Sequence, residues 1–481
     1  MTTNDDHTTA AGWRDILRGR YAAASAVLAA GIALHAINIT LSATMLPSIV
    51  AEIGGQDLYA WNATLPTLAA ILSAAVTGRL LRRTGARLGF GLAALVFGTG
   101  SLLAALALSM PVLIVGRVVQ GAGGGMLFTL CYSMIVVVYP EWLWSRAMAL
   151  LSGTWGITML FGPAVGGIFA ELDMWRLGFG IMLPVAGLFV VLTLRLLPKT
   201  KRDHAASDPI AFGQLALLAG AVLAVSLGSI APSPLWALVA VTASVLMIVT
   251  LLRREHTGRS RLFPRGAATP GAPLFLALAV MSLLIFGINA EFFMPFYLQK
   301  LHAMSPLMAG YIAALVSIGW AVSEVWSARF TGREMHRAVL SGPLLMLVAC
   351  ILLGTVTPLY DSAGLVATLV LSGALIGLGV GIGIGWPHLN TFILQFTDDD
   401  ERDMAASALS TVQMFSVAFG TALAGLVGNF TGFNDDGNLA SIANSAIWLF
   451  VTFGAVAVLA ALVARQLIKS HKGARNEAIV S

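Results

Sequence analysis

Fourteen long apolar runs follow one another along the sequence, and they limit the possible folds more than any other feature. A helix of about 20 apolar residues spans the core of a bilayer. Only 11% of the 481 residues are charged, against about 25% in a typical soluble domain, so the chain cannot cover a water-facing surface. The sequence therefore predicts an all-α integral membrane protein. The runs lie at about 22–48, 61–81, 88–108, 111–138, 145–170, 177–197, 210–230, 234–252, 273–298, 307–328, 338–358, 362–390, 404–428 and 441–466.

Lys and Arg residues are concentrated in every second gap between the runs. Because such residues collect on the cytoplasmic side of a membrane, we expect both termini in the cytoplasm and a multi-pass protein in the cell (inner or plasma) membrane. This topology, and not nucleic-acid binding, accounts for the net charge of +5. The cytoplasmic gaps and tail hold Arg79, Arg82, Arg83, Arg87, Lys199, Lys201, Arg202, Arg253, Arg254, Arg259, Arg261, Arg265, Arg329, Arg333, Arg337, Lys469, Lys472 and Arg475. The opposite gaps hold Glu52, Asp57, Asp361, Asp435 and Asp436.

A short internal repeat predicts how the runs are grouped. The gap after the second run reads Arg82-Arg83-Thr84-Gly85, and the gap after the tenth reads Arg329-Phe330-Thr331-Gly332. Two related halves around a central cavity are a recurring plan of secondary transporters, so we expect two six-helix halves plus two extra central helices. The expected parts are a cytoplasmic N-terminal tail (1–21), an N-terminal half (22–198), a central linker with two extra transmembrane helices (199–272), a C-terminal half (273–466) and a cytoplasmic C-terminal tail (467–481).

The sequence carries no pattern typical of a catalytic or metal site: no phosphate-binding loop, metal-ligand spacing or nucleophile elbow. Cys131 and Cys350 both lie inside apolar runs, where we interpret them as reduced packing residues. We therefore expect no enzyme activity, metal or cofactor, and any uphill transport must draw on a gradient. The expected partners are a small-molecule substrate, membrane lipid and protons.

Three motifs carry a family resemblance. They read GRLLRRTGAR at 78–87, RVVQGAG at 117–123 and GPAVGG at 162–167. Together with Trp175-Arg176, Pro295–Gln299 and Ser305-Pro306, they make nearly the whole chain resemble the major facilitator superfamily, and within it the fourteen-span drug:proton antiporter branch. The resemblance implies conformational roles for two groups of residues. In the signature loop between the second and third runs they are Gly78, Arg83, Gly85 and Arg87. In the fifth run, called span 5, they are Gly162, Pro163, Gly166 and Gly167. Helix packing alone remains an alternative for these glycines.

The sequence departs from that branch at two positions where the branch normally carries an acid. Arg82 stands where the signature loop normally carries an acid, and Asn38 stands where span 1 normally carries an Asp. Asn cannot titrate, so the branch's usual proton site is missing.

Several polar residues inside the apolar runs are candidates for a substrate or proton pathway, since such residues are expensive in lipid. His35, Asn38 and Ser42 share one face of span 1. Arg117 lies about 9 Å from the outer end of span 4 by helical rise, so it either snorkels to the surface or faces a polar interior. The full set of candidates is His35, Asn38, Ser42, Arg117, Gln120, Asn289 and Glu291, with His388 and Glu324 as weaker ones nearer the cytoplasmic ends.

The leading functional interpretation is a secondary active transporter that exports drugs or amphipathic metabolites in exchange for protons. Trp61, Trp155, Phe286, Phe292, Phe293 and Trp320 are candidates for stacking surfaces. The alternative is an importer of an organic nutrient, such as a flavin-like vitamin, on the same scaffold; the missing Asp and the reversed charge at Arg82 favour it. A non-transporting receptor or lipid-handling protein is a third class.

Overall fold

The computed structural model describes residues 13–197, 211–257, 261–360, 364–398, 401–435 and 437–480. Within these ranges fourteen helices are long and apolar enough to cross a membrane, which confirms the number predicted from the sequence. Several charged residues of the gaps lie outside the described ranges, namely Lys199, Lys201, Arg202, Arg259, Asp361 and Asp436.

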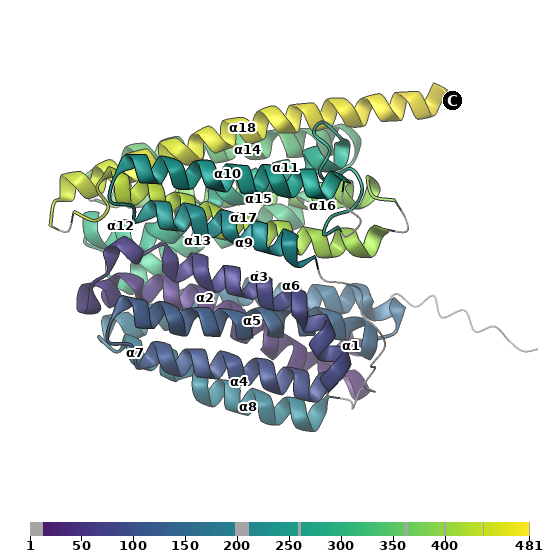
Figure 1. The fold of residues 1–481 in the computed structure, drawn as a ribbon, viewed down its shortest axis with the longest axis horizontal. Coiled ribbons are helices and arrows are strands. Elements are labelled where there is room, and N and C mark those ends of the chain that lie inside the picture. The colour runs from purple at the N-terminus through teal and green to yellow at the C-terminus, as the bar shows by residue number, and fades with distance from the viewer. Residues whose placement is uncertain are drawn as a thin grey trace, which may run out of the picture.

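The helices form two layers that face each other (Figure 1). The lower layer contains α1 (Trp13–Leu17), η1 (Gly19–Tyr21), α2 (Ala22–Ile53), η2 (Gln56–Leu58), α3 (Trp61–Thr84), α4 (Ala86–Ala105), α5 (Met110–Val138), α6 (Glu141–Glu171), α7 (Trp175–Gly180) and α8 (Met182–Leu196). The upper layer contains α11 (Pro273–Ile288), η3 (Asn289–Phe293), α12 (Met294–Leu301), α13 (Pro306–Ser327), α14 (Gly332–Val356), α15 (Leu365–Gly383), α16 (Trp386–Gln395), α17 (Arg402–Thr431) and α18 (Leu439–Val480).

Two further helices, α9 (Phe212–Ser229) and α10 (Pro234–Thr257), lie with the upper layer. α9 packs against α10 and α17, and it also reaches α3 of the lower layer. Leu68 of α3, Val222 of α9 and Ala418 of α17 form a small buried cluster there. The α9–α10 hairpin therefore covers the seam between α3 and α17.

The repeated loop sequence has a glycine with positive φ at the same position in both copies. Gly85, between α3 and α4, has φ of +78°, and Gly332, at the start of α14, has φ of +56°. Side-chain-bearing residues rarely adopt this conformation, so glycine suits both positions. Gly78, which belongs to the same motif, lies inside α3 with open space around it. The positive φ of this loop is therefore at Gly85 and not at Gly78.

Several contacts between the layers lie near η2, at the end of the bundle away from α1; Figure 1 shows this end opposite the end of α18. The Gln56 side chain donates a hydrogen bond to the Phe433 carbonyl, and Asn429 Nδ2 donates to the Asp57 carbonyl at 2.8 Å. The ring of Tyr59 lies 5.3 Å from that of Phe293 and 5.2 Å from that of Phe433. We call this the closed end of the bundle.

Candidate functional site

A cavity of about 520 Å³ lies between the two layers, and both layers line it. The lower layer contributes residues of α2, α3, α5 and α6, and the upper layer contributes residues of α11, η3, α12, α13, α16 and α17. Most of the lining is apolar or aromatic. Such a cavity, with few polar groups, is a typical small-molecule site.

On the lower wall, Arg117 of α5 is the centre of a hydrogen-bond network. Its Nη1 donates to Asn38 Oδ1 at 2.8 Å and to Gln120 Oε1 at 2.6 Å. Gln120 Nε2 in turn donates to Ser101 Oγ of α4 at 2.7 Å. Only 3% of the Arg117 surface is exposed, so the side chain faces the interior and does not snorkel. Its guanidinium also lies over the ring of Phe179, 5.9 Å from the centroid.

His35 is the second polar group on this wall. It lines the cavity between the rings of Phe128 and Trp155, with centroids at 5.9 and 5.8 Å. Its Nδ1 is buried and has no hydrogen-bond partner among the described residues. Gly124 leaves room for the imidazole, since a Cβ there would stand 2.3 Å from Nδ1.

Ser42 lies on the same helix but plays a different structural role. Its hydroxyl accepts a hydrogen bond from Asn62 Nδ2 at 2.9 Å, which ties α2 to α3. Asn62 lines the cavity, whereas Ser42 lies behind it. The polar face predicted for span 1 thus divides into two cavity residues, His35 and Asn38, and one packing residue.

On the upper wall, the helix is interrupted where the polar residues occur. The segment Asn289–Phe293 forms the short 3₁₀ element η3 between α11 and α12. Asn289 is buried, and its Nδ2 donates to the Ile285 carbonyl at 2.8 Å and to the Ser416 carbonyl at 3.3 Å. Glu291 lines the cavity and is half-buried. Its carboxylate has no ion-pair partner among the described residues.

The small residues of α6 let three helices approach closely. A Cβ added to Gly162 would stand 1.7 Å from Thr40 Oγ1 of α2, and one added to Gly166 would stand 2.7 Å from the Leu41 carbonyl oxygen. A Cβ on Gly167 would stand 2.6 Å from the Cα of Leu307 in α13. Pro163 lies inside α6 and lines the cavity. The motif therefore joins both layers beside the cavity.

The basic loop lies away from the cavity. Arg83 is exposed at the end of α3, and Arg87 Nε donates to the Leu197 carbonyl at 2.7 Å, which links the start of α4 to the end of α8. Neither residue lines the cavity. The loop residues are thus separated from the substrate-pathway candidates.

Some residues of the cavity were only weak candidates for the substrate or proton pathway in the sequence, or were not candidates at all. Glu324 lines the cavity and accepts a hydrogen bond from Trp320 Nε1 at 2.9 Å, and the ring of Trp320 lies 5.0 Å from that of Trp386. Asn62 and Tyr132 also line it. His388, Trp61 and Phe286 do not. The i, i+4 spacing of Trp320 and Glu324 is the sequence signal that marks a shared helix face.

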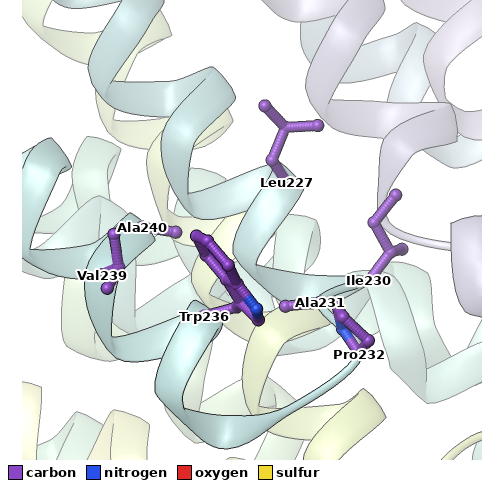
Figure 2. A pocket seen from close by; sticks show the side chains of 7 residues that line it. All are labelled: Leu227, Ile230, Ala231, Pro232, Trp236, Val239 and Ala240. Atoms are coloured by element: carbon purple, nitrogen blue, oxygen red, sulfur yellow. The ribbon is translucent and has the colours of Figure 1, made fainter.

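A second, smaller recess lies between the ends of α9 and α10 (Figure 2). Six of its seven lining side chains carry no polar atom, and Trp236 supplies only an indole N–H. The lining residues are Leu227, Ile230, Ala231, Pro232, Trp236, Val239 and Ala240. We therefore place the candidate site in the central cavity.

Comparison with known proteins agrees with this geometry. Residues 28–421 match the family model described as Major Facilitator Superfamily. A probable multidrug-efflux transporter of Mycobacterium tuberculosis is 34% identical over 425 residues, covering 87% of this chain and 89% of the relative. The multidrug transporter protein MdtP of Bacillus subtilis is 25% identical, covering 82% and 73%.

Among solved structures, a D-xylose-proton symporter matches with a TM-score of 0.65 at 16% identity, covering 93% of this chain and 97% of that one. A peptide transporter POT matches with a TM-score of 0.64 at 16% identity, covering 93% and 97%. These similarities show the shared fold. Taken with the family match over most of the chain, they establish that this protein is a secondary transporter of the major facilitator superfamily.

Proposed function

We propose that the protein exports amphipathic organic compounds from the cytoplasm in exchange for protons. The observation that carries this proposal is the central cavity of about 520 Å³, with aromatic residues of both layers in its lining. Trp155 and Phe128 supply flat apolar surfaces on the lower wall, and Phe292 and Trp320 supply them on the upper wall. Aromatic surfaces accept many shapes of apolar cargo. The names of the multidrug-efflux relatives support the same substrate class.

We assign the proton-carrying role to Glu291. The position of the branch's span 1 acid is occupied by Asn38, whose amide cannot titrate and whose oxygen accepts from Arg117. Glu291 is a titratable carboxylate on the cavity wall, with no ion-pair partner among the described residues. It can therefore exchange protons with whichever side the cavity faces.

The proposed direction follows from topology. The Lys and Arg distribution predicts that the chain ends lie in the cytoplasm, so the closed end of the bundle would face outward. The cavity then receives its cargo from the cytoplasmic side.

Everted membrane vesicles test the proposal with Nile red, a neutral amphipathic dye. Vesicles with the parent protein should take up the dye when the interior is acidified. Glu291→Gln keeps the shape of the side chain and removes its charge, so gradient-driven accumulation should collapse while energy-independent dye exchange continues. Parent-like accumulation by this variant at every pH would refute the role of Glu291.

Direction is tested in cells. Loss of an exporter should sensitise a strain to amphipathic toxic compounds. Loss of an importer should instead create a requirement for an organic nutrient such as a vitamin, and that result would replace the export proposal with the import alternative.

A further inference from the structure

Charged side chains on the cavity wall are divided by layer. Among the described residues that line the cavity, the lower layer contributes the cation Arg117 and the upper layer contributes the carboxylates Glu291 and Glu324. Glu324 accepts a hydrogen bond from Trp320 within its own helix. In the described part of the chain, neither Arg117 nor Glu291 has an ion-pair partner. The hydrogen bonds of Arg117 go to neutral amides. In the described lining, the basic side chain therefore lies on one wall and the carboxylic acid side chains lie on the other.

Arg117 lacks a counter-ion. The two hydrogen bonds described for its guanidinium both leave from Nη1 and go to neutral amide oxygens. Its Nε is buried and has no acceptor among the described residues. A buried, unpaired charge is costly, and a guanidinium is well suited to a carboxylate, which accepts two parallel hydrogen bonds. A ligand carboxylate in the cavity would supply the missing charge.

The two unpaired charges lie toward the same end of the cavity. Arg117 is seven residues from Met110, the first residue of α5, so it lies about 10 Å from that end of the helix. Met110 itself lies at the closed end, because a Cβ added to Gly55 in the loop there would stand 2.5 Å from the Cβ of Met110. Glu291 is two residues from Phe293, whose ring contacts Tyr59 at the closed end. Both side chains also line the same cavity from opposite layers, which is the arrangement that a bridging ligand requires.

We propose that the preferred substrate is a zwitterionic amphiphile that bridges the two layers, with an anionic group at Arg117, an ammonium group at Glu291 and an aromatic body between them. This inference rests on the proposed function and specifies the substrate class of the same site. An organic cation leaves Arg117 unpaired, an organic anion leaves Glu291 unpaired, and a neutral compound leaves both. Only the zwitterion compensates both charges.

The binding test uses four forms of one rigid aromatic scaffold and the purified full-length protein. The zwitterion is 4′-(aminomethyl)biphenyl-4-carboxylic acid; its methyl ester is a cation, its N-acetyl derivative is an anion, and the doubly blocked compound is neutral. Titration calorimetry should show the zwitterion binding at least about tenfold more tightly than each other form, because a charge-assisted hydrogen bond contributes a factor of this size or more.

Variants then identify which side chain binds each charged group of the ligand. In Arg117→Gln the zwitterion and its methyl ester should bind equally. In Glu291→Gln the zwitterion and its N-acetyl derivative should bind equally. Glu334→Gln changes an exposed carboxylate outside the cavity lining, and it should preserve the parent pattern. If Arg117→Gln fails to fold, the ligand series on the parent protein and the Glu291→Gln arm still decide the question.

Equal binding of all four compounds, tighter binding of a singly charged form, or no binding of the zwitterion would overturn the proposal. These outcomes differ from failure of the proposed function, which is measured with neutral Nile red in vesicles. A protein that moves Nile red but shows no preference for the zwitterion is an exporter of another substrate class. A protein that moves no amphiphile at all is not the proposed exporter.

Discussion

Replacing Gly166 by Ala tests the packing of α6 with the smallest possible change. The new Cβ would stand 2.7 Å from the Leu41 carbonyl oxygen and 3.0 Å from the Leu41 Cα, where ordinary contacts begin at 3.4 Å. Both neighbours are backbone atoms, so no side-chain rotation relieves the clash and the two helices must separate by several tenths of an ångström. Overpacking of this kind costs about 1–3 kcal/mol.

The matched control is Gly187→Ala in α8, where the glycine is exposed and nothing lies within 4 Å of an added Cβ. Both variants gain the same helix propensity of about 1 kcal/mol, so their difference isolates the clash. Thermal unfolding of the purified proteins should show Gly166→Ala about 1–3 kcal/mol less stable than Gly187→Ala. Gly166→Leu should also lose transport, and Gly187→Leu should keep it. Equal stability and equal transport of the paired variants would refute the close packing of α2 and α6.

The remaining predictions concern topology, the polar network and the closed end. A cysteine replacing Arg333 should be shielded from an impermeant thiol reagent added outside cells, whereas one replacing Asp435 should react; the reverse pattern would invert the proposed orientation. Asn38→Leu removes an acceptor of Arg117 and should lower the free energy of unfolding by about 1.5–3 kcal/mol in denaturation measurements. Phe433→Ala removes ring contacts with Tyr59 at 5.2 Å and should lengthen fluorescence-measured distances across the closed end, where no change would contradict its role.

The sequence predicted the helices well because spanning a bilayer depends on the length and apolarity of each run alone. It also placed His35 and Glu291 inside the membrane, and the structure places both on the cavity wall. The partners of these residues were not predictable, because they belong to other helices. The depth of Arg117 alone left two orientations open, and only the position of Asn38 on α2 shows that the guanidinium turns inward.

The helices that the α6 glycines contact could not be predicted from the sequence either. The spacing of Gly162, Gly166 and Gly167 indicates a narrow helix surface, but not that two of them meet α2 and the third meets α13 of the opposite layer. The division of the chain at 198 and 272 and the cytoplasmic position of both termini stay predictions, as do the functional roles of the candidate residues.

Because α9 covers the seam on one side of the bundle, the two sides of the transporter present different surfaces to the surrounding lipid. Trp61 of the lower layer donates to the Ser226 carbonyl of α9 at 3.1 Å, and Asn429 of the upper layer donates to the Ser229 carbonyl at 3.0 Å. α9 is therefore hydrogen-bonded to both layers, and a separation of the layers beside α9 requires one of these bonds to break. Meanwhile the hairpin screens the α3–α17 seam from acyl chains. The opposite flank, where α6 packs against α13, lies outside the cover of this hairpin, so the surrounding lipid meets a different surface on each flank of the transporter.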